Sequence, residues 1–125
     1  MKRQALFFAW AITITQHPVA ADVALAALDN GASGLSDVCI GMLNQVVNCE
    51  PSLLWATDVN TIYTDATLSA LCTSTCKDSL VSYVSRVHTA CGTSRLDGGD
   101  GLSYLAAYQS ELLLENYNVV CLTNA

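Results

Sequence analysis

Apolar residues recur along most of the chain at the three-to-four-residue spacing of an amphipathic helix. The pattern is longest over residues 65–91, where Asp65 can cap a helix start and Gly92 can supply a left-handed stop. Its expected buried stripe consists of Cys72, Cys76, Leu80, Val84, Val87 and Cys91, widened by Leu68, Leu71 and Tyr83. We therefore expect one long helix over 65–91. A break between Leu71 and Ser79 stays open, because the hydroxyl residues 73–75 compete for backbone hydrogen bonds.

Shorter helical patterns flank this segment on both sides. Ser36 can cap a helix that stops around Asn48, Pro51 suits the first turn of a short helix through Trp55, and Ser103 can open a last helix. The expected inward positions of the first helix are Cys39, Met42, Leu43, Val46 and Val47. Those of the last helix are Tyr104, Leu105, Tyr108, Leu112 and Leu113, and Cys121 is expected to fix its end through a disulfide. The stretches 58–64 and 95–101 are expected to be connections. The expected fold class is therefore all-α, a small disulfide-stapled helical domain of four to five helices.

The first residues show the three zones of a secretory signal peptide. Met1-Lys2-Arg3 precedes an apolar run over 5–14, and the small residues Val19 and Ala21 fit cleavage after Ala21. This predicts a signal peptide over 1–21, a flexible N-terminal arm over 22–35 and a six-cysteine helical domain over 36–125. The apolar run is too short to cross about 30 Å of hydrocarbon, and no later stretch is longer. We therefore expect a secreted, extracellular protein without a membrane span.

The charge of the mature chain limits its partners. The whole sequence carries a formal charge of −6, and loss of Lys2 and Arg3 with the signal peptide leaves three basic residues against eleven carboxylates, a charge of −8. Nucleic acids and anionic membrane surfaces attract positive patches, so both are disfavoured as partners.

The six cysteines predict a disulfide framework. Cys39, Cys49, Cys72, Cys76, Cys91 and Cys121 are even in number and all follow the signal peptide, so three disulfides are expected. A structural zinc needs four converging ligands, commonly from two close pairs, whereas only Cys72 and Cys76 form a close pair. The C-x-x-C spacing of a redox dithiol is absent as well. We therefore expect no metal site and no cofactor.

Candidate catalytic residues are few. His88 is the only histidine of the mature chain, and its neighbours one helical turn away, Val84 and Gly92, cannot orient it as a base. Asp97 and Asp100 lie in a glycine-rich turn, without the alternate acids and distal Glu of an EF-hand. We therefore expect no enzyme and no catalytic residue. The alternative, a secreted enzyme of unrecognised type, requires a cleft in which His88 or several acids converge.

Aromatic residues are the other candidates for contacting a ligand. Exposed rings stack on sugar faces, whereas buried rings fill cores or line lipid cavities. Most of the aromatic side chains lie in the predicted helices and are expected to be core, whereas Trp55 and Tyr63 lie outside the best-defined ones. These two are the rings most expected at the surface.

The cysteine frame resembles a module of secreted fungal proteins. The stretches CIGMLNQVVNC, CTSTC, CKDSLVSYVSRVHTAC and NYNVVCLTNA are similar to the cysteine-rich helical segments that flank LysM repeats in fungal LysM proteins, and the resemblance covers residues 37–123. Such proteins bind chitin or related N-acetylglucosamine polymers, and some are effectors that hide wall fragments from a host. The resemblance therefore implies an effector-like or cell-wall-associated role. No LysM repeat is recognisable here, so no chitin-contacting residue is carried over.

A weaker similarity is to elicitins, secreted oomycete helical proteins with six cysteines and a sterol-holding cavity. They share the close central cysteine pair and the gap of fourteen residues before the fifth cysteine, although their first two cysteines are further apart. The elicitin pairing implies Cys39–Cys91, Cys49–Cys76 and Cys72–Cys121, one of the fifteen connectivities open to six cysteines. Two roles follow: a secreted, non-catalytic interaction protein whose partner is a cell-wall polysaccharide or a host protein, or a carrier of a sterol or other lipid.

Overall fold

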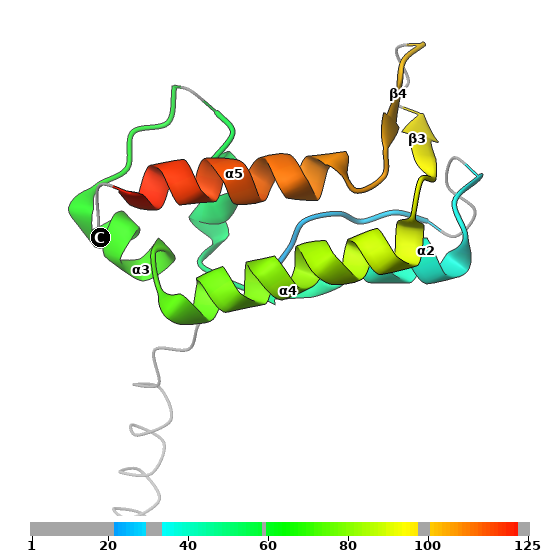
Figure 1. Cartoon of the computed structure of the whole chain (residues 1–125). Helices are drawn as coiled ribbons and strands as arrows, with labels where there is room; N and C mark the ends of the chain where they lie inside the picture. Colours follow the sequence, from blue (N-terminus) through cyan, green and yellow to red (C-terminus); the bar gives the residue numbers. More distant parts are fainter. Residues whose placement is uncertain (1–21, 30–33, 59, 98–100, 123–125) are drawn as a thin grey trace, which may run out of the picture.

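Helix α4 (Ser74–Cys91) is the longest element of the described chain, and helices α2 (Asp37–Leu43) and α5 (Tyr108–Leu122) both pack against it (Figure 1). The computed structural model describes residues 22–29, 34–58, 60–97 and 101–122. The colours of Figure 1 show that α4 and α5 run antiparallel. The buried face of α4 consists of Cys76, Leu80, Tyr83, Val84, Val87 and Cys91. The apolar stripe predicted for this part of the chain is therefore confirmed.

The single helix predicted over 65–91 is wrong, because the chain breaks at residues 72 and 73. Helix α3 (Asp65–Leu71) ends at Cys72, whose backbone leaves the helical region with φ −88° and ψ 64°. Thr73 then caps α4: its Oγ1 accepts a hydrogen bond from the N–H of Cys76 at 3.1 Å. The break lies within the interval left open by the sequence, and its cause is the expected one, a hydroxyl that competes for backbone groups.

The first predicted helix ends earlier than its apolar pattern. Ser36 caps α2 as expected, but α2 stops at Leu43, and Val46–Asn48 form strand β2. Strand β1 (Asp22–Ala24) pairs antiparallel with β2, with Val23 opposite Val47. Both of these valines are buried. Strand β1, more than twenty residues away, thus supplies β2 with backbone hydrogen bonds that the local pattern could not reveal. The β-branched side chains of the valines favour the strand conformation.

The segment predicted to be a flexible arm, residues 22–35, makes defined contacts where it is described. This segment contains strand β1. The backbone N–H and carbonyl of Leu28 are hydrogen-bonded to the Asn44 side chain, and Leu35 is buried in the core. The predicted signal peptide over 1–21 and residues 30–33 lie outside the described residues.

The chain after α4 also contains short strands. Strands β3 (Arg95–Asp97) and β4 (Ser103–Leu105) form an antiparallel hairpin with Leu96 opposite Tyr104. Helix α5 therefore begins at Tyr108 and not at Ser103 as predicted. Earlier in the chain, Pro51–Trp55 form the expected short helix as a 3-10 turn, η2, which is capped by Glu50.

The fold class is therefore only partly as predicted. Four α-helices and the 3-10 helix η2 agree with four to five helices, but two small antiparallel sheets mean that the described fold is not strictly all-α. No helix within the described residues is long and apolar enough to cross a membrane.

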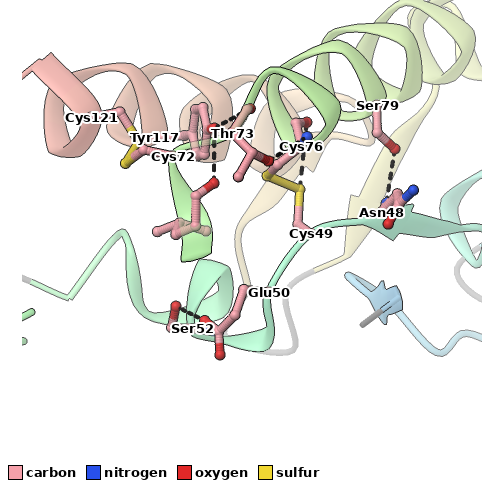
Figure 2. Close-up of a disulfide and its surroundings, with 11 residues drawn as sticks. Asn48, Cys49, Glu50, Ser52, Cys72, Thr73, Cys76, Ser79, Tyr117 and Cys121 are labelled. Atoms are coloured by element: carbon pink, nitrogen blue, oxygen red, sulfur yellow. Dashed lines mark hydrogen bonds between the residues drawn. A yellow bond between two sulfur atoms is a disulfide. The ribbon is translucent and has the colours of Figure 1, made fainter. Parts of the chain in front are cut away.

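Three disulfides join the elements around α4. They are Cys39–Cys91, Cys49–Cys76 and Cys72–Cys121, the pairs that the elicitin resemblance implies. Figure 2 shows two of them at the start of α4, where Cys76 reaches the segment after β2 and Cys72 reaches the end of α5. In the same view, the N–H of Asn48 donates to Ser79 Oγ at 2.9 Å. The beginning of α4 is thus linked to β2 and the residue after it, and Cys72, just before α4, is linked to the end of α5.

Candidate functional site

An apolar pocket of about 310 Å³ lies where η2, α4 and α5 meet the stretch that follows β1. This stretch, residues 25–28, is called the N-terminal segment below. The floor of the pocket is formed by Leu43, Tyr83, Ala106, Ser110 and Leu113, all of which are buried. These residues come from α2, α4, α5 and the turn before α5. The pocket therefore exists only in the assembled fold, which explains why no sequence pattern predicted it.

The polar groups of the floor are already bonded to the protein. Tyr83 donates its hydroxyl to the carbonyl of Leu43 at 2.7 Å, and Ser110 donates its hydroxyl to the carbonyl of Ala107 at 2.8 Å. Burial raises the pKa of Tyr83 to about 12, so this hydroxyl keeps its proton at physiological pH. The floor consequently offers a ligand apolar surface and little else.

One wall of the pocket is the N-terminal segment. Leu25, Ala26 and Leu28 line the pocket, and this blue segment lies between α4 and α5 in Figure 1. Asn44, at the end of α2, holds the segment with two hydrogen bonds: its Oδ1 accepts from the N–H of Leu28, and its Nδ2 donates to the carbonyl of Leu28, both at 2.8 Å. The amide thus acts as a bidentate clamp on an otherwise irregular stretch.

The rim of the pocket is formed by the lining residues that remain exposed: Leu54, Thr57 and Gln109. Thr57 and Gln109 are polar but uncharged, and Leu96 completes the lining with another apolar side chain. Among the residues that the structure describes, no Asp, Glu, His, Lys, Arg or Cys lines the pocket. An apolar pocket with a few uncharged polar groups at its mouth is typical of sites for small apolar molecules.

A second hollow, of about 420 Å³, lies beside the Cys72–Cys121 disulfide, and it is more open than the first. Lys77 Nζ donates to Asn118 Oδ1 at 2.8 Å across it. Tyr117 forms its buried side, where the hydroxyl donates to the carbonyl of Leu71 at 3.0 Å and burial raises its pKa. Because this hollow is more open and the side chains of Lys77, Asn118 and Tyr117 are already hydrogen-bonded within the protein, it is the weaker candidate for a ligand site.

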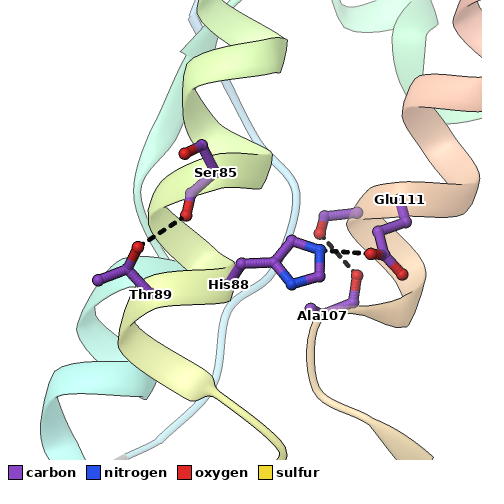
Figure 3. A network of polar contacts seen from close by, with 6 residues as sticks. Ser85, His88, Thr89, Ala107 and Glu111 are labelled. Atoms are coloured by element: carbon purple, nitrogen blue, oxygen red, sulfur yellow. Dashed lines mark hydrogen bonds and ion pairs between the residues drawn. The ribbon is translucent and has the colours of Figure 1, made fainter.

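His88 has a partner that sequence reasoning missed. It forms an ion pair with Glu111, which projects from α5 toward α4 in Figure 3. The two residues are 23 positions apart and lie on different helices, so helical spacing could not reveal this contact. Both side chains are nearly half exposed, and neither lines the apolar pocket. The nearby hydroxyl of Thr89 donates to the carbonyl of Ser85 on its own helix.

The remaining sequence candidates are dispersed. Asp97 lies in β3, whereas Asp100 lies outside the described residues. Within the described chain, no three His, Cys, Asp or Glu side chains are placed to share a metal ion. Trp55 is 59% exposed, as expected. Tyr63 is only half-buried and donates its hydroxyl to the carbonyl of Ser52 at 3.0 Å; burial, with Glu50 and Asp58 nearby, raises its pKa.

Comparison with known proteins finds one family and two relatives. Residues 23–125 match the model of the secreted LysM effector N-terminal domain. One LysM domain-containing protein of Arthroderma benhamiae is 38% identical over 86 residues, which cover 67% of this chain and 15% of the relative. Another from the same organism is 33% identical over 88 residues, covering 70% of this chain and 16% of the relative. No solved structure matches the chain. The chain thus spans about one sixth of the length of these curated relatives.

Proposed function

Because the chain belongs to the secreted LysM effector N-terminal domain family, we propose that this fungal effector-like, extracellular module acts by binding and not by catalysis. Its binding site is the apolar pocket between the N-terminal segment, η2, α4 and α5, and its ligand is a small apolar molecule. The relatives are more than six times longer than the stretch they share with this chain.

One observation carries this proposal: the floor of the pocket is apolar, and its two hydroxyl groups already donate hydrogen bonds to backbone carbonyls. A nucleophile or base needs a free polar atom that faces the ligand. Tyr83 and Ser110 are both hydrogen-bonded within the protein, and none of the described residues that line the pocket is charged. Transfer of an apolar ligand into such a space is favoured by about 25 cal/mol per Å² of apolar surface removed from water.

A titration with N-phenylnaphthylamine, an uncharged dye that brightens in apolar surroundings, tests the proposal. We expect saturable binding of one dye per chain. The variant Ala26→Phe places a ring where Ala26 lines the pocket, and should weaken dye binding at least tenfold. Ala27→Phe is the matched control, since Ala27 is its exposed neighbour and does not line the pocket. Equal affinity in the two variants, with both folded, would place the dye elsewhere and overturn the proposal.

A second candidate function is contact with a cell-wall polysaccharide, and the exposed ring of Trp55 favours it. Sedimentation with insoluble chitin separates the two functions. If the pocket is the site, the protein stays in the supernatant, and Trp55→Ala changes nothing. Sedimentation that is lost in Trp55→Ala but kept in Ala26→Phe would instead support the polysaccharide.

A further inference from the structure

The volume of the apolar pocket limits the size of its ligand. An apolar cavity of roughly 150 Å³ holds benzene, which has six carbon atoms. By this comparison, a space of about 310 Å³ holds an alkyl chain of about ten to twelve carbon atoms. A four-ring sterol with about 27 carbon atoms needs more than twice that space and would remain largely outside, whereas a well-held ligand is mostly buried.

The floor of the pocket excludes the polar end of such a ligand. The Tyr83 and Ser110 hydroxyls are already donated to backbone carbonyls, and the other floor side chains, Leu43, Ala106 and Leu113, are apolar. A polar head placed there would lose its hydrogen bonds to water with little in return. The chain therefore enters tail first, and the head stays at the rim.

The rim suits an uncharged head. Gln109 has an amide that both donates and accepts hydrogen bonds, and Thr57 has a hydroxyl. In the described part of the chain, no Lys, Arg or His lines the pocket to pair with a carboxylate head. Asp58 follows Thr57 directly in the sequence, and the whole chain carries a formal charge of −6, so the surrounding field disfavours anions.

From size, floor and rim together, we infer that the pocket binds a single unbranched aliphatic chain with an uncharged polar head, such as a fatty alcohol. The inference rests on the proposed function, because it names the ligand class of the same pocket. Fatty-acid anions and sterols are the two lipid classes that the geometry disfavours.

Displacement of bound N-phenylnaphthylamine by a series of alcohols tests the chain length. Hexanol, octanol, decanol, dodecanol and tetradecanol are compared below their aqueous solubility limits. We expect affinity to rise about fourfold for each methylene group buried, and to level off near ten to twelve carbons. An affinity independent of chain length, or one that keeps rising through tetradecanol, would overturn the inference. Failure of the dye itself to bind would overturn the proposed function instead.

The head group is tested at pH 8 with dodecanol, dodecanoate and a sterol as competitors. We expect dodecanol to displace the dye at least tenfold better than either of the others. Gln109→Lys adds a cation at the rim and should raise the ratio of dodecanoate to dodecanol affinity about threefold, the effect of an exposed ion pair. Gln45→Lys, at an exposed position that does not line the pocket, should leave that ratio unchanged. A sterol or an anion that binds as well as dodecanol in the unmodified protein would refute the assignment.

Discussion

At the scale of single residues, Asn44 and Tyr83 fix the backbone around the apolar pocket. Asn44 connects the end of α2 to the N-terminal segment, and Tyr83 connects α4 to the end of α2. The Asn44 bonds span 16 residues of sequence, and the Tyr83 bond spans 40. The two side chains therefore determine whether the pocket walls stay in place when no ligand is bound.

We predict that Asn44→Ala destabilises the protein by about 2 kcal/mol, because it removes both hydrogen bonds to Leu28 and leaves partly buried backbone groups unpaired. Dye affinity should fall as well, since the wall formed by Leu25, Ala26 and Leu28 loses its clamp. Urea unfolding and the dye titration measure the two effects. The matched control is Gln45→Ala, at the next and exposed position, which should change neither. Unchanged dye affinity in Asn44→Ala would show that the wall needs no clamp.

Tyr83 makes stability depend on pH in the alkaline range. Burial raises the pKa of Tyr83 to about 12 in the folded protein, whereas the ordinary value in the unfolded chain is about 10. The unfolded chain therefore loses this proton first as pH rises. Stability is fully present below about pH 10 and falls by about 2 to 3 kcal/mol between pH 10 and 12. Tyr63 and Tyr117, whose pKa values burial also raises, act in the same direction.

Unfolding measured from pH 8 to 12 checks this dependence. The fall above pH 10 should be shallower in Tyr83→Phe, because the titrating hydroxyl is gone. The same substitution at the exposed Tyr108 should leave the slope unchanged. A slope that is equal in all three proteins would assign the alkaline loss to other groups.

At the scale of elements, the disulfides differ in how deeply they are buried. Cys49 and Cys76 are 1% exposed, whereas Cys72 and Cys121 are half-buried. Loop closure alone gives about 4 kcal/mol for the 49-residue separation of Cys72–Cys121 and about 3.5 kcal/mol for the 27-residue separation of Cys49–Cys76. Removal of the buried pair also leaves a cavity in the core.

We therefore predict that the double variant Cys49→Ala/Cys76→Ala is destabilised at least as much as Cys72→Ala/Cys121→Ala, despite its shorter loop. Urea midpoints under matched oxidising conditions compare the two. In the second variant, hydrogen exchange should rise mainly near the end of α5, which then loses its link to residue 72. A clearly larger loss in the second variant would mean that loop length outweighs burial here.

Helical periodicity predicted the buried face of α4 but not the ends of its neighbours. The stripe from Cys76 to Cys91 is local, so the residues themselves specify it. Val46 and Val47 fit a helical face equally well, but they pair with β1, which lies more than twenty residues earlier. Likewise, residues 103–105 pair with residues 95–97 as strands, so α5 begins only at Tyr108. Boundaries decided by distant backbone partners are not encoded in a local pattern.

At the scale of the whole molecule, the pocket could not be predicted for the same reason. Its lining residues approach one another only when α5 lies over α4; they are Leu25, Ala26, Leu28, Leu43, Leu54, Thr57, Tyr83, Leu96, Ala106, Gln109, Ser110 and Leu113. The alternative of a lipid carrier came from a resemblance and not from any of these residues. The His88–Glu111 pair was missed in the same way, because it joins two helices that the sequence could not orient.

The loops closed by the three disulfides interleave, and this has a consequence for export. Cys49–Cys76 lies inside the loop closed by Cys39–Cys91, and Cys72 lies inside both loops while its partner, Cys121, lies outside them. A chain that enters an oxidising compartment from its N-terminus presents Cys39 and Cys49 to each other before either native partner has arrived. A Cys39–Cys49 pair formed at that stage has to be exchanged through a mixed disulfide before the native pairs can form. The native set is complete only after Cys121 has been translocated, and any exchange step takes seconds to hours.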